Sequence, residues 1–318
     1  MTPDIAYAAL LPEICLSVLA LALLLLNFAV GEGGKGSIAG VAVAGLVVAG
    51  ACMVPLWNHP VTTFVGSYAV DNFSLFFKTV FLVAAGLAIL HSGAYLRQEG
   101  SEHGEYYALL LFATVGMMVM ASGRDLMVIY VGLELMSITF YALVGLIRTR
   151  LTSNEASLKY FLLGAFSSGF LLYGFSLLYG LTGTTSIAGI HAFLAARPDT
   201  VGAPLVLAMV LVLIGLGFKL ALAPLHFWAP DVYQGAPTPV TGFLSVGSKA
   251  ATFAALLRIF GSGLAGQGAV WAELLTGLAV LTMIVGNLLA IQQSDIKRML
   301  AYSSIAHAGY AMVGVVDE

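Results

Sequence analysis

The fold is decided by residues 205–260, which read LVLAMVLVLIGLGFKLALAPLHFWAPDVYQGAPTPVTGFLSVGSKAATFAALLRIF. The stretch begins as an apolar helix that carries Lys219 and is then interrupted by Pro224 and Pro230. It resumes as a second apolar helix that holds Lys249 at mid-depth. A lysine at the centre of a bilayer costs roughly 3 kcal/mol. A broken helix at membrane depth is tolerated only where protein buries it or where it lines a water-filled cavity. We therefore expect an internal polar pathway for ions or protons.

The composition is that of a membrane protein. Hydrophobic residues make up 60% of the 318 residues and charged residues 9%, and the mean hydropathy is +0.97. Ordinary globular chains carry about 25% charged residues, so we expect an all-α polytopic membrane protein. The net charge of −3 indicates no partner, and no basic run suggests nucleic-acid binding. Cys15 and Cys52 lie in apolar stretches, outside any CxxC or Cys/His cluster, so no disulfide, iron–sulfur centre or zinc site is expected.

Apolar segments of membrane-spanning length follow one another along the whole chain. A spanning helix needs about 20 apolar residues, and that length predicts about ten spans. No positive segment precedes the first of them, so we expect a retained span and not a cleaved signal. The links are short, which predicts a single compact bundle. The predicted spans are 6–29, 38–57, 71–96, 105–122, 125–147, 155–181, 203–224, 238–260, 267–291 and 296–316.

Positive charges are divided unequally between the two sets of links, and cytoplasmic links carry the excess of Lys and Arg. The links after even-numbered spans hold Arg124 and Arg197, with Arg258 at the end of a helix. The links after odd-numbered spans are richer and hold Lys35, Arg97, Arg148, Arg150, Lys297 and Arg298, with Lys159 starting the next helix. The odd-numbered links are therefore predicted to be cytoplasmic, which places both visible ends of the chain outside.

The fifth span carries a buried carboxylate. Glu134 lies well inside the span, and Tyr130, Ser137 and Tyr141 stand at i−4, i+3 and i+7 from it, on one helix face. A carboxylate at this depth is either protonated or paired with a cation. Lys219 is the natural partner. Two interpretations stay open: a titratable pair within a proton path, or a structural ion pair that only joins two helices.

The break beside Lys219 opens the backbone of its helix. Pro224 removes a backbone donor and clashes with the carbonyl one turn back. Backbone groups next to Lys219 are thereby freed for water or other polar groups. His226 follows the break, and it is predicted either to relay protons or to cap the broken helix.

On the eighth span, the side chains near Lys249 predict a hydrated face, and these are Ser245, Ser248 and Thr252. The candidate relay therefore consists of Glu134, Lys219, His226 and Lys249.

Three further polar side chains lie in or near the spans, and two of them have two interpretations each. Lys78 lies about two turns into the third span and is predicted to snorkel to the outer surface. Glu155 has the spacing of a capping box with Thr152, and it is an i, i+4 neighbour of Lys159. Lys159 either forms a solvated pair there or stands at the mouth of a cytoplasmic proton path. His307, in the last span, is either a hydrogen-bonded core histidine or a continuation of the polar path.

Three strings of this sequence carry a family resemblance. They are NEASLKYFLLGAFSSGFLLYG (154–174), GFKLALAPLHFWAPDVYQGAPTPVTGFLSVGSKAA (217–251) and SDIKRMLAYSSIAHAGYAMVG (294–314). The chain resembles the antiporter-like membrane subunits of respiratory complex I, and the resemblance extends over essentially its whole length. The resemblance implies the fold of that family, which has about fourteen helices. These include two inverted five-helix repeats, each with one broken helix.

The resemblance divides the chain into three parts of one transmembrane domain. Residues 1–104 would be the first three helices, 105–260 the first repeat (helices four to eight), and 261–318 the start of the second repeat. Glu134 matches the family's fifth-helix glutamate and Lys219 the lysine of its broken seventh helix. Lys249, by the same resemblance, matches the eighth-helix lysine. The chain stops after the tenth helix, so we expect a truncated sequence, with a naturally short form as the alternative.

The implied function is proton translocation by a membrane subunit of an NADH-quinone oxidoreductase in the cell inner (plasma) membrane. NADH, FMN, iron–sulfur clusters and quinone are expected on other subunits, and no cofactor on this chain. The expected partners are the other membrane subunits and the lipid bilayer. Two alternatives stay open: a subunit of a multi-subunit sodium/proton antiporter, and a structural scaffold whose buried charges only lock the helices together.

Overall fold

The computed structural model describes residues 6–29, 35–101, 103–197 and 202–317. Within them, ten helical spans are long and apolar enough to cross a membrane, which confirms the all-α polytopic fold. Nine are single helices: α1 (Tyr7–Ala29), α2 (Lys35–Met53), α3 (Asn72–Gln98), α4 (Glu105–Ser122), α5 (Leu126–Val144), α6 (Leu151–Thr182), α8 (Ala203–Leu220), α12 (Gly268–Ile291) and α13 (Ile296–Val316). The remaining span joins α10 (Thr238–Phe243), a π-helical turn η4 (Leu244–Ser248), α11 (Lys249–Leu256) and a second π-helical turn η5 (Leu257–Gly263).

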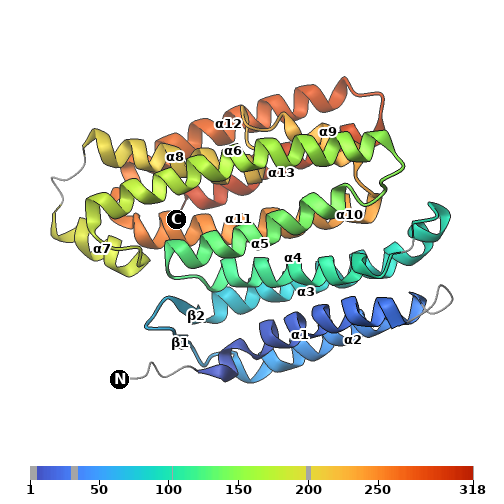
Figure 1. The fold of residues 1–318 in the computed structure, drawn as a ribbon. Helices are drawn as coiled ribbons and strands as arrows, with labels where there is room; N and C mark the ends of the chain where they lie inside the picture. The colour runs from blue at the N-terminus through green and yellow to red at the C-terminus, as the bar shows by residue number, and fades with distance from the viewer. Residues whose placement is uncertain (1–5, 30–34, 102, 198–201, 318) are drawn as a thin grey trace.

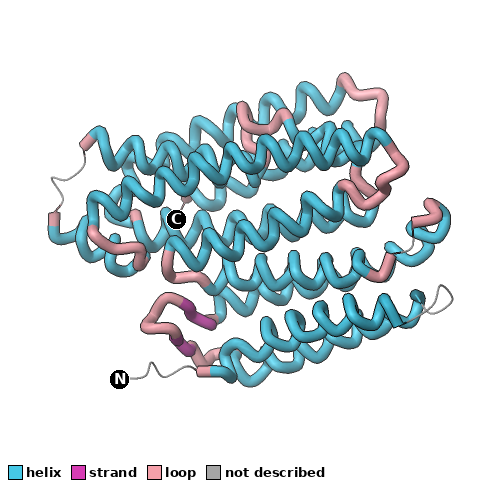
Figure 2. The backbone as a smooth tube through the Cα atoms, viewed as in Figure 1, coloured by secondary structure: helices cyan, strands magenta, loops and turns pink. Residues whose placement is uncertain are grey.

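The spans lie side by side, and their links alternate between two ends of the bundle (Figures 1 and 2). The "hairpin end" carries the antiparallel strands β1 (Val61–Thr63) and β2 (Tyr68–Val70) and the short helix α7 (Ile187–Ala196). The "α9 end" carries α9 (Trp228–Gly235) and the links that follow α3, α5 and α12. The start of α1 and the end of α13 both lie at the hairpin end, as an even number of spans requires.

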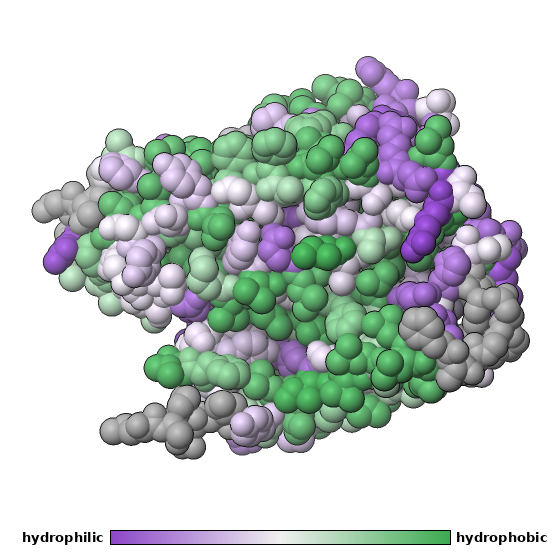
Figure 3. All heavy atoms as spheres, viewed as in Figure 1, coloured by the Kyte–Doolittle hydropathy of each residue, from purple (hydrophilic) through white to green (hydrophobic). Residues whose placement is uncertain are grey.

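The outer surface has the apolar character expected of a lipid-facing bundle. Large apolar side chains such as Leu25, Leu90, Phe166 and Ile284 are more than half exposed. On the face drawn in Figure 3, hydrophobic residues cover the middle of the bundle and hydrophilic residues gather at the α9 end. A hydrocarbon layer accepts such a surface, whereas water does not.

Several helix starts are fixed by acidic caps at the ends of the bundle. The carboxylates of Asp71, Asp125 and Asp295 each accept a hydrogen bond from a backbone N–H in the first turn of α3, α5 and α13. The predicted capping box at Thr152 is wrong, because α6 begins at Leu151 and Thr152 lies inside the helix. The next residue, Ser153, instead ties the start of α6 to the end of α5, because its hydroxyl donates to the Val144 carbonyl.

The predicted break is confirmed. Helix α8 ends at Leu220, Ala221 adopts a left-handed backbone with φ of 57°, and α9 starts only at Trp228. The peptide bond between Ala223 and Pro224 is cis. The chain thus leaves the helical path within the bundle and not at its surface, since residues 220–223 are all buried.

Candidate functional site

Lys219 lies at the end of α8 in a pocket of neutral polar and aromatic groups. Its side chain is buried, with 1% of the residue exposed. The Nζ atom donates to Ser137 Oγ at 2.7 Å and to Tyr141 OH at 3.3 Å, both on α5. It also lies 5.5 Å and 5.8 Å from the ring centroids of Tyr141 and Tyr160, within cation–π range. The predicted polar face of α5 therefore does meet Lys219.

Glu134 lies one turn from Ser137 and is held by another helix. Its Oε1 accepts a hydrogen bond of 2.5 Å from Ser168 Oγ on α6. The predicted direct pairing with Lys219 is not present, since no ion pair joins the two among the described residues. Ser137 and Tyr141 take the ammonium group, and Ser168 takes the carboxylate.

The backbone groups freed by the break are satisfied by side chains. Trp228 Nε1 donates to the Phe218 carbonyl at 2.8 Å, one residue before Lys219. On the other side of the break, Ala223 N donates to Thr282 Oγ1 of α12 at 2.9 Å. This arrangement makes an interrupted helix stable at membrane depth, where unpaired backbone groups are costly. Sequence reasoning expected polar groups here but could not name these two.

His226 lies in the break between α8 and α9, but its side chain does not bridge the two sides. Its ring is half-buried, and Nδ1 is buried without a well-formed hydrogen bond to any described residue. The ring centroid lies 6.4 Å from that of Tyr302 on α13. No side-chain bond from His226 caps α8 in the described part of the chain, so of its two predicted roles the capping role is not observed.

Lys249 begins α11 and reaches across to α13. It is 7% exposed, and Nζ donates to the Ser304 carbonyl at 2.6 Å and to Ser304 Oγ at 2.8 Å. Of the side chains predicted to form a hydrated face, Ser248 and Thr252 are buried in the protein and do not face lipid, and Thr252 Oγ1 bonds the Ser248 carbonyl. Ser245 is half-buried and bonds its own turn. The π-helical turn before Lys249 is a feature often found at functional positions.

His307 lies on the exposed side of α13. Its Nδ1 bonds the Ser303 carbonyl one turn back at 2.8 Å, and its ring stacks edge-on with Tyr310. The prediction of a core histidine is therefore wrong for this chain, because His307 is exposed. No described contact joins His307 to the other members of the relay.

Lys159 belongs to a charged pocket of about 500 Å³ at the α9 end. Its Nζ lies 2.7 Å from both Glu155 and Asp231, and Arg298 Nη1 lies 2.6 Å from the other Asp231 oxygen. The predicted i, i+4 pair is confirmed, whereas Asp231 and Arg298 were not foreseen. Burial raises the pKa of Asp231, but the bonds from Lys159 and Arg298 lower it by more, so this carboxyl stays ionised below its usual range.

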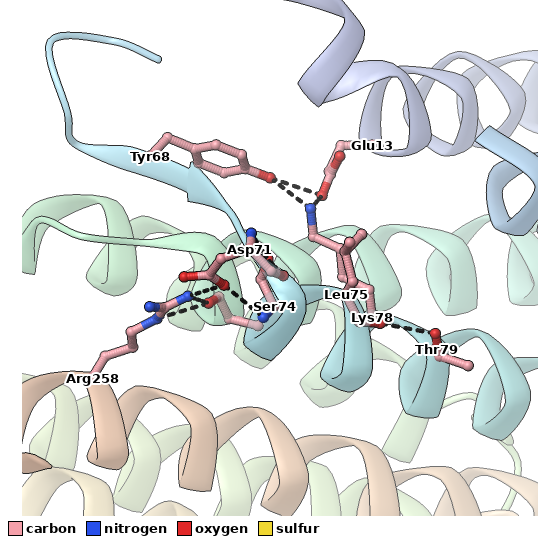
Figure 4. A network of polar contacts seen from close by, with 9 residues as sticks. Glu13, Tyr68, Asp71, Ser74, Leu75, Lys78, Thr79 and Arg258 are labelled. Carbon is pink, nitrogen blue, oxygen red and sulfur yellow. Dashed lines mark hydrogen bonds and ion pairs between the residues drawn. The ribbon is translucent and has the colours of Figure 1, made fainter. Parts of the chain in front are cut away.

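Lys78 does not snorkel. It is completely buried, and its Nζ lies 2.7 Å from the Glu13 carboxylate on α1 (Figure 4). A buried partner on another helix holds the ammonium inside, which the position of Lys78 in the sequence could not reveal. Neither this cluster nor any other described group of His, Cys, Asp and Glu is arranged to hold a metal ion.

An interrupted helix, a buried lysine without a direct counter-ion among the described residues and a nearby glutamate define an antiporter-like class of polytopic membrane protein. The family profile described as "NADH:quinone oxidoreductase/Mrp antiporter, TM" matches residues 123–317. The chain belongs to this family.

Known relatives give the same picture. NADH-quinone oxidoreductase subunit N of Trichlorobacter lovleyi is 53% identical over 305 residues, which are 96% of this chain and 63% of that protein. A chain of respiratory complex I from Thermus thermophilus with bound Aureothin superposes with a TM-score of 0.81 at 40% identity, over 96% of this chain and 64% of that one. A chain of the Mrp complex from Dietzia sp. has a TM-score of 0.80 over 98% of this chain and 59% of its own, and its 24% identity supports the fold alone. The chain spans less than two thirds of these relatives.

Proposed function

We propose that this chain is a proton-translocating membrane subunit of the subunit N type in an NADH-quinone oxidoreductase. In that role it couples electron transfer from NADH to quinone to proton movement across the cell inner membrane. The observation that carries the proposal is Lys219, a buried lysine at a break in its helix whose hydrogen-bond partners are neutral. The names of the relatives at high identity support the same assignment.

The mechanism is electrostatic. Ser137 and Tyr141 hold the protonated Lys219, and the through-space charge of Glu134 favours that state. When Glu134 is neutralised or α5 moves, Lys219 loses that support and releases its proton, because burial disfavours an uncompensated charge. Lys249, at mid-depth on the next span, receives the proton and passes it along the bundle. His226 in the break and Lys159 in the charged pocket serve uptake from the α9 end, and His307 continues the path beyond Lys249.

Several further assignments belong to this proposal. Residues 105–260 form one five-helix repeat, residues 1–104 precede it, and residues 261–318 begin a second repeat. The α9 end faces the cytoplasm, so the start of α1 faces the periplasm. The partners are the other membrane subunits of the complex and the lipid bilayer. NADH, FMN, iron–sulfur clusters and quinone are assigned to other subunits of the complex. No redox centre is assigned to this chain.

The test separates proton exchange from a purely structural charge at Lys219. Lys219→Ala removes the charge, whereas Lys219→Arg keeps a charge that cannot be released in a protein. We expect both variants, and Glu134→Gln, to lower the number of protons pumped per NADH oxidised several-fold in inverted vesicles. If Lys219→Arg pumps normally, the residue only locks the helices, and the scaffold interpretation replaces this one.

The partner of the chain is tested separately. The tagged, natively expressed protein would be isolated from gently solubilised membranes and assayed for NADH:quinone activity and for flavin and iron–sulfur spectra. We expect the activity and the cofactors to co-purify with it. Membrane partners without a redox centre would instead identify a subunit of a sodium/proton antiporter, which the family description also includes.

A further inference from the structure

A second buried ion pair lies in the N-terminal helices, outside the site described above. Glu13 of α1 and Lys78 of α3 are 5% and 0% exposed, and Lys78 Nζ lies 2.7 Å from Glu13 Oε1. Each is the seventh residue of its helix, which places both roughly 9 Å in from the hairpin end at 1.5 Å per residue. The proposed path through Lys219 and Lys249 does not use this pair.

The hairpin supplies the third member. Tyr68 of β2 points toward the pair, and its hydroxyl donates to Glu13 Oε1 at 2.8 Å and lies 3.4 Å from Lys78 Nζ (Figure 4). The strand pairing with β1 and a bridge to Gly123 hold Tyr68 in place. Burial first, and the Glu13 charge second, raise the pKa of Tyr68 well above its usual value. Tyr68 therefore remains a hydrogen-bond donor.

The contacts to the Glu13 carboxylate are one-sided. Lys78 and Tyr68 both bind Oε1, whereas Oε2 is buried without a hydrogen-bond partner among the described residues. The Ser122 hydroxyl lies close to Tyr68 in the same buried region. A pair that serves only to join two helices is stabilised when both oxygens are bonded, because unpaired buried polar atoms are costly. Oε2 is thus an open proton acceptor.

The surrounding charges do not supply another partner. Asp71 at the start of α3 pairs with Arg258 of η5 at 2.7 Å (Figure 4). It also pairs with Arg124 at 3.5 Å. The members of the cluster are Glu13 on α1, Lys78 on α3 and Tyr68 in the hairpin. From α4 the nearby group is the uncharged Ser122. The three-residue cluster is therefore neutral as it stands, and one added proton gives it a single positive charge.

We propose that Glu13, Lys78 and Tyr68 form a second proton-exchange site, which takes up and releases a proton at Glu13 Oε2 near the hairpin end. On uptake an O–H bond forms at Oε2, Lys78 keeps its charge, and the hydrogen bond from Tyr68 to Oε1 is retained. On release the same O–H bond breaks and the ion pair is restored. The site concerns the N-terminal helices alone, so its test does not depend on the function of Lys219.

A hydrophobic carbodiimide gives a direct readout, because it reacts with protonated carboxyl groups in apolar surroundings. The carboxyl O–H adds across one C=N bond, and the adduct rearranges to a stable acylurea without a leaving group. The intact complex in membranes would be treated between about pH 6 and pH 9 and the peptide containing Glu13 analysed by mass spectrometry. We expect labelling of Glu13 to fall with rising pH, by up to roughly tenfold per unit as the carboxyl ionises. Glu155, exposed at the α9 end, serves as the unlabelled control.

Three variants sharpen the result. Lys78→Met removes the opposite charge, so labelling at a fixed pH rises by about tenfold or more. Tyr68→Phe removes only the donor to Oε1 and raises labelling by a smaller factor, and it serves if the lysine variant does not assemble. Glu13→Gln abolishes the labelled peptide. If Glu13 stays unlabelled at every pH in the native protein and in the variant that assembles, the pair is permanently ionised and the proposal is wrong. Labelling that does not change with pH overturns it equally.

Discussion

At the scale of single residues, the lysines differ in the charge of their partners. Lys219 and Lys249 bond neutral oxygens, from Ser137 and Tyr141 in one case and from Ser304 in the other. Lys78 and Lys159, in contrast, lie within 2.7 Å of carboxylates. A buried ammonium with neutral partners is easily neutralised, whereas one paired to a carboxylate is held charged. Lys219 and Lys249 are therefore suited to release a proton themselves. At Lys78 and Lys159, proton exchange needs a second proton acceptor beside the lysine.

Ser137 has a specific part in this arrangement. Its hydroxyl donates to the Leu133 carbonyl at 2.6 Å, which turns an oxygen lone pair toward Lys219. Ser137→Ala removes a hydrogen bond to a charged group, worth about 1.5–3 kcal/mol. Because that bond favours the protonated lysine, its loss should shift the alkaline side of the pH profile of pumping toward lower pH, by roughly one unit or more. The measurement is proton pumping by inverted vesicles across a pH series.

Thr139 provides the matched control, since it lies on the same helix, is buried and bonds only backbone carbonyls among the described residues. Thr139→Val should leave the pH profile in place. Equal profiles for the Ser137 and Thr139 variants would show that Ser137 does not support the charge on Lys219.

At the scale of elements, the break in α8 could be predicted and its closure could not. Pro224 and the glycines before it are visible in the sequence, and they indicate where the helix must stop. The groups that satisfy the free ends are Trp228 and Thr282, and Thr282 comes 59 residues after the amide that it binds. Nothing in the local pattern marks a threonine in the middle of α12 as part of this site. Hydropathy finds helices, but pairing across helices depends on packing.

Trp228 joins the two sides of the break, so its hydrogen bond should matter for stability and for function. Trp228→Phe keeps most of the stacking with Tyr160 but removes the indole hydrogen bond to the Phe218 carbonyl, which keeps its backbone bond from Ala221 N, at a cost of about 0.5–1.5 kcal/mol. We expect a lower thermal unfolding midpoint of the solubilised complex and reduced pumping, because the end of α8 that carries Lys219 is no longer fixed. Trp271 is the control, since its indole also donates to a backbone carbonyl, that of Leu264, at the hairpin end. Trp271→Phe should lose stability without a matching loss of pumping; equal losses would place Trp228 outside the site.

At the scale of the whole molecule, the sequence predicted the bundle well and its internal contacts poorly. All ten spans match the predicted segments, because each is long, apolar and bounded by polar or helix-breaking residues. The cluster of Glu13 and Lys78 was missed because the two lie 65 positions apart on α1 and α3 and each alone looks like an interfacial charge. One of the two interpretations of His307, a core histidine, requires a core that this chain does not build around it. One-dimensional patterns fix depth in the membrane, but they do not fix which helix faces which.

The orientation of the bundle is the last prediction, and it concerns the molecule as a unit. The α9 end gathers Arg148, Arg150, Lys297 and Arg298, so the positive-inside rule places this end in the cytoplasm. Single cysteines would replace Val65, 93% exposed at the turn of the hairpin, and Thr149, exposed in the link after α5. The background is Cys15→Ala with Cys52→Ala. A membrane-impermeant maleimide should label Val65→Cys in intact spheroplasts and Thr149→Cys only in inverted vesicles. The reverse pattern would turn the whole bundle over, and Lys159 with its charged pocket would then face the periplasm and could not take up protons from the cytoplasm.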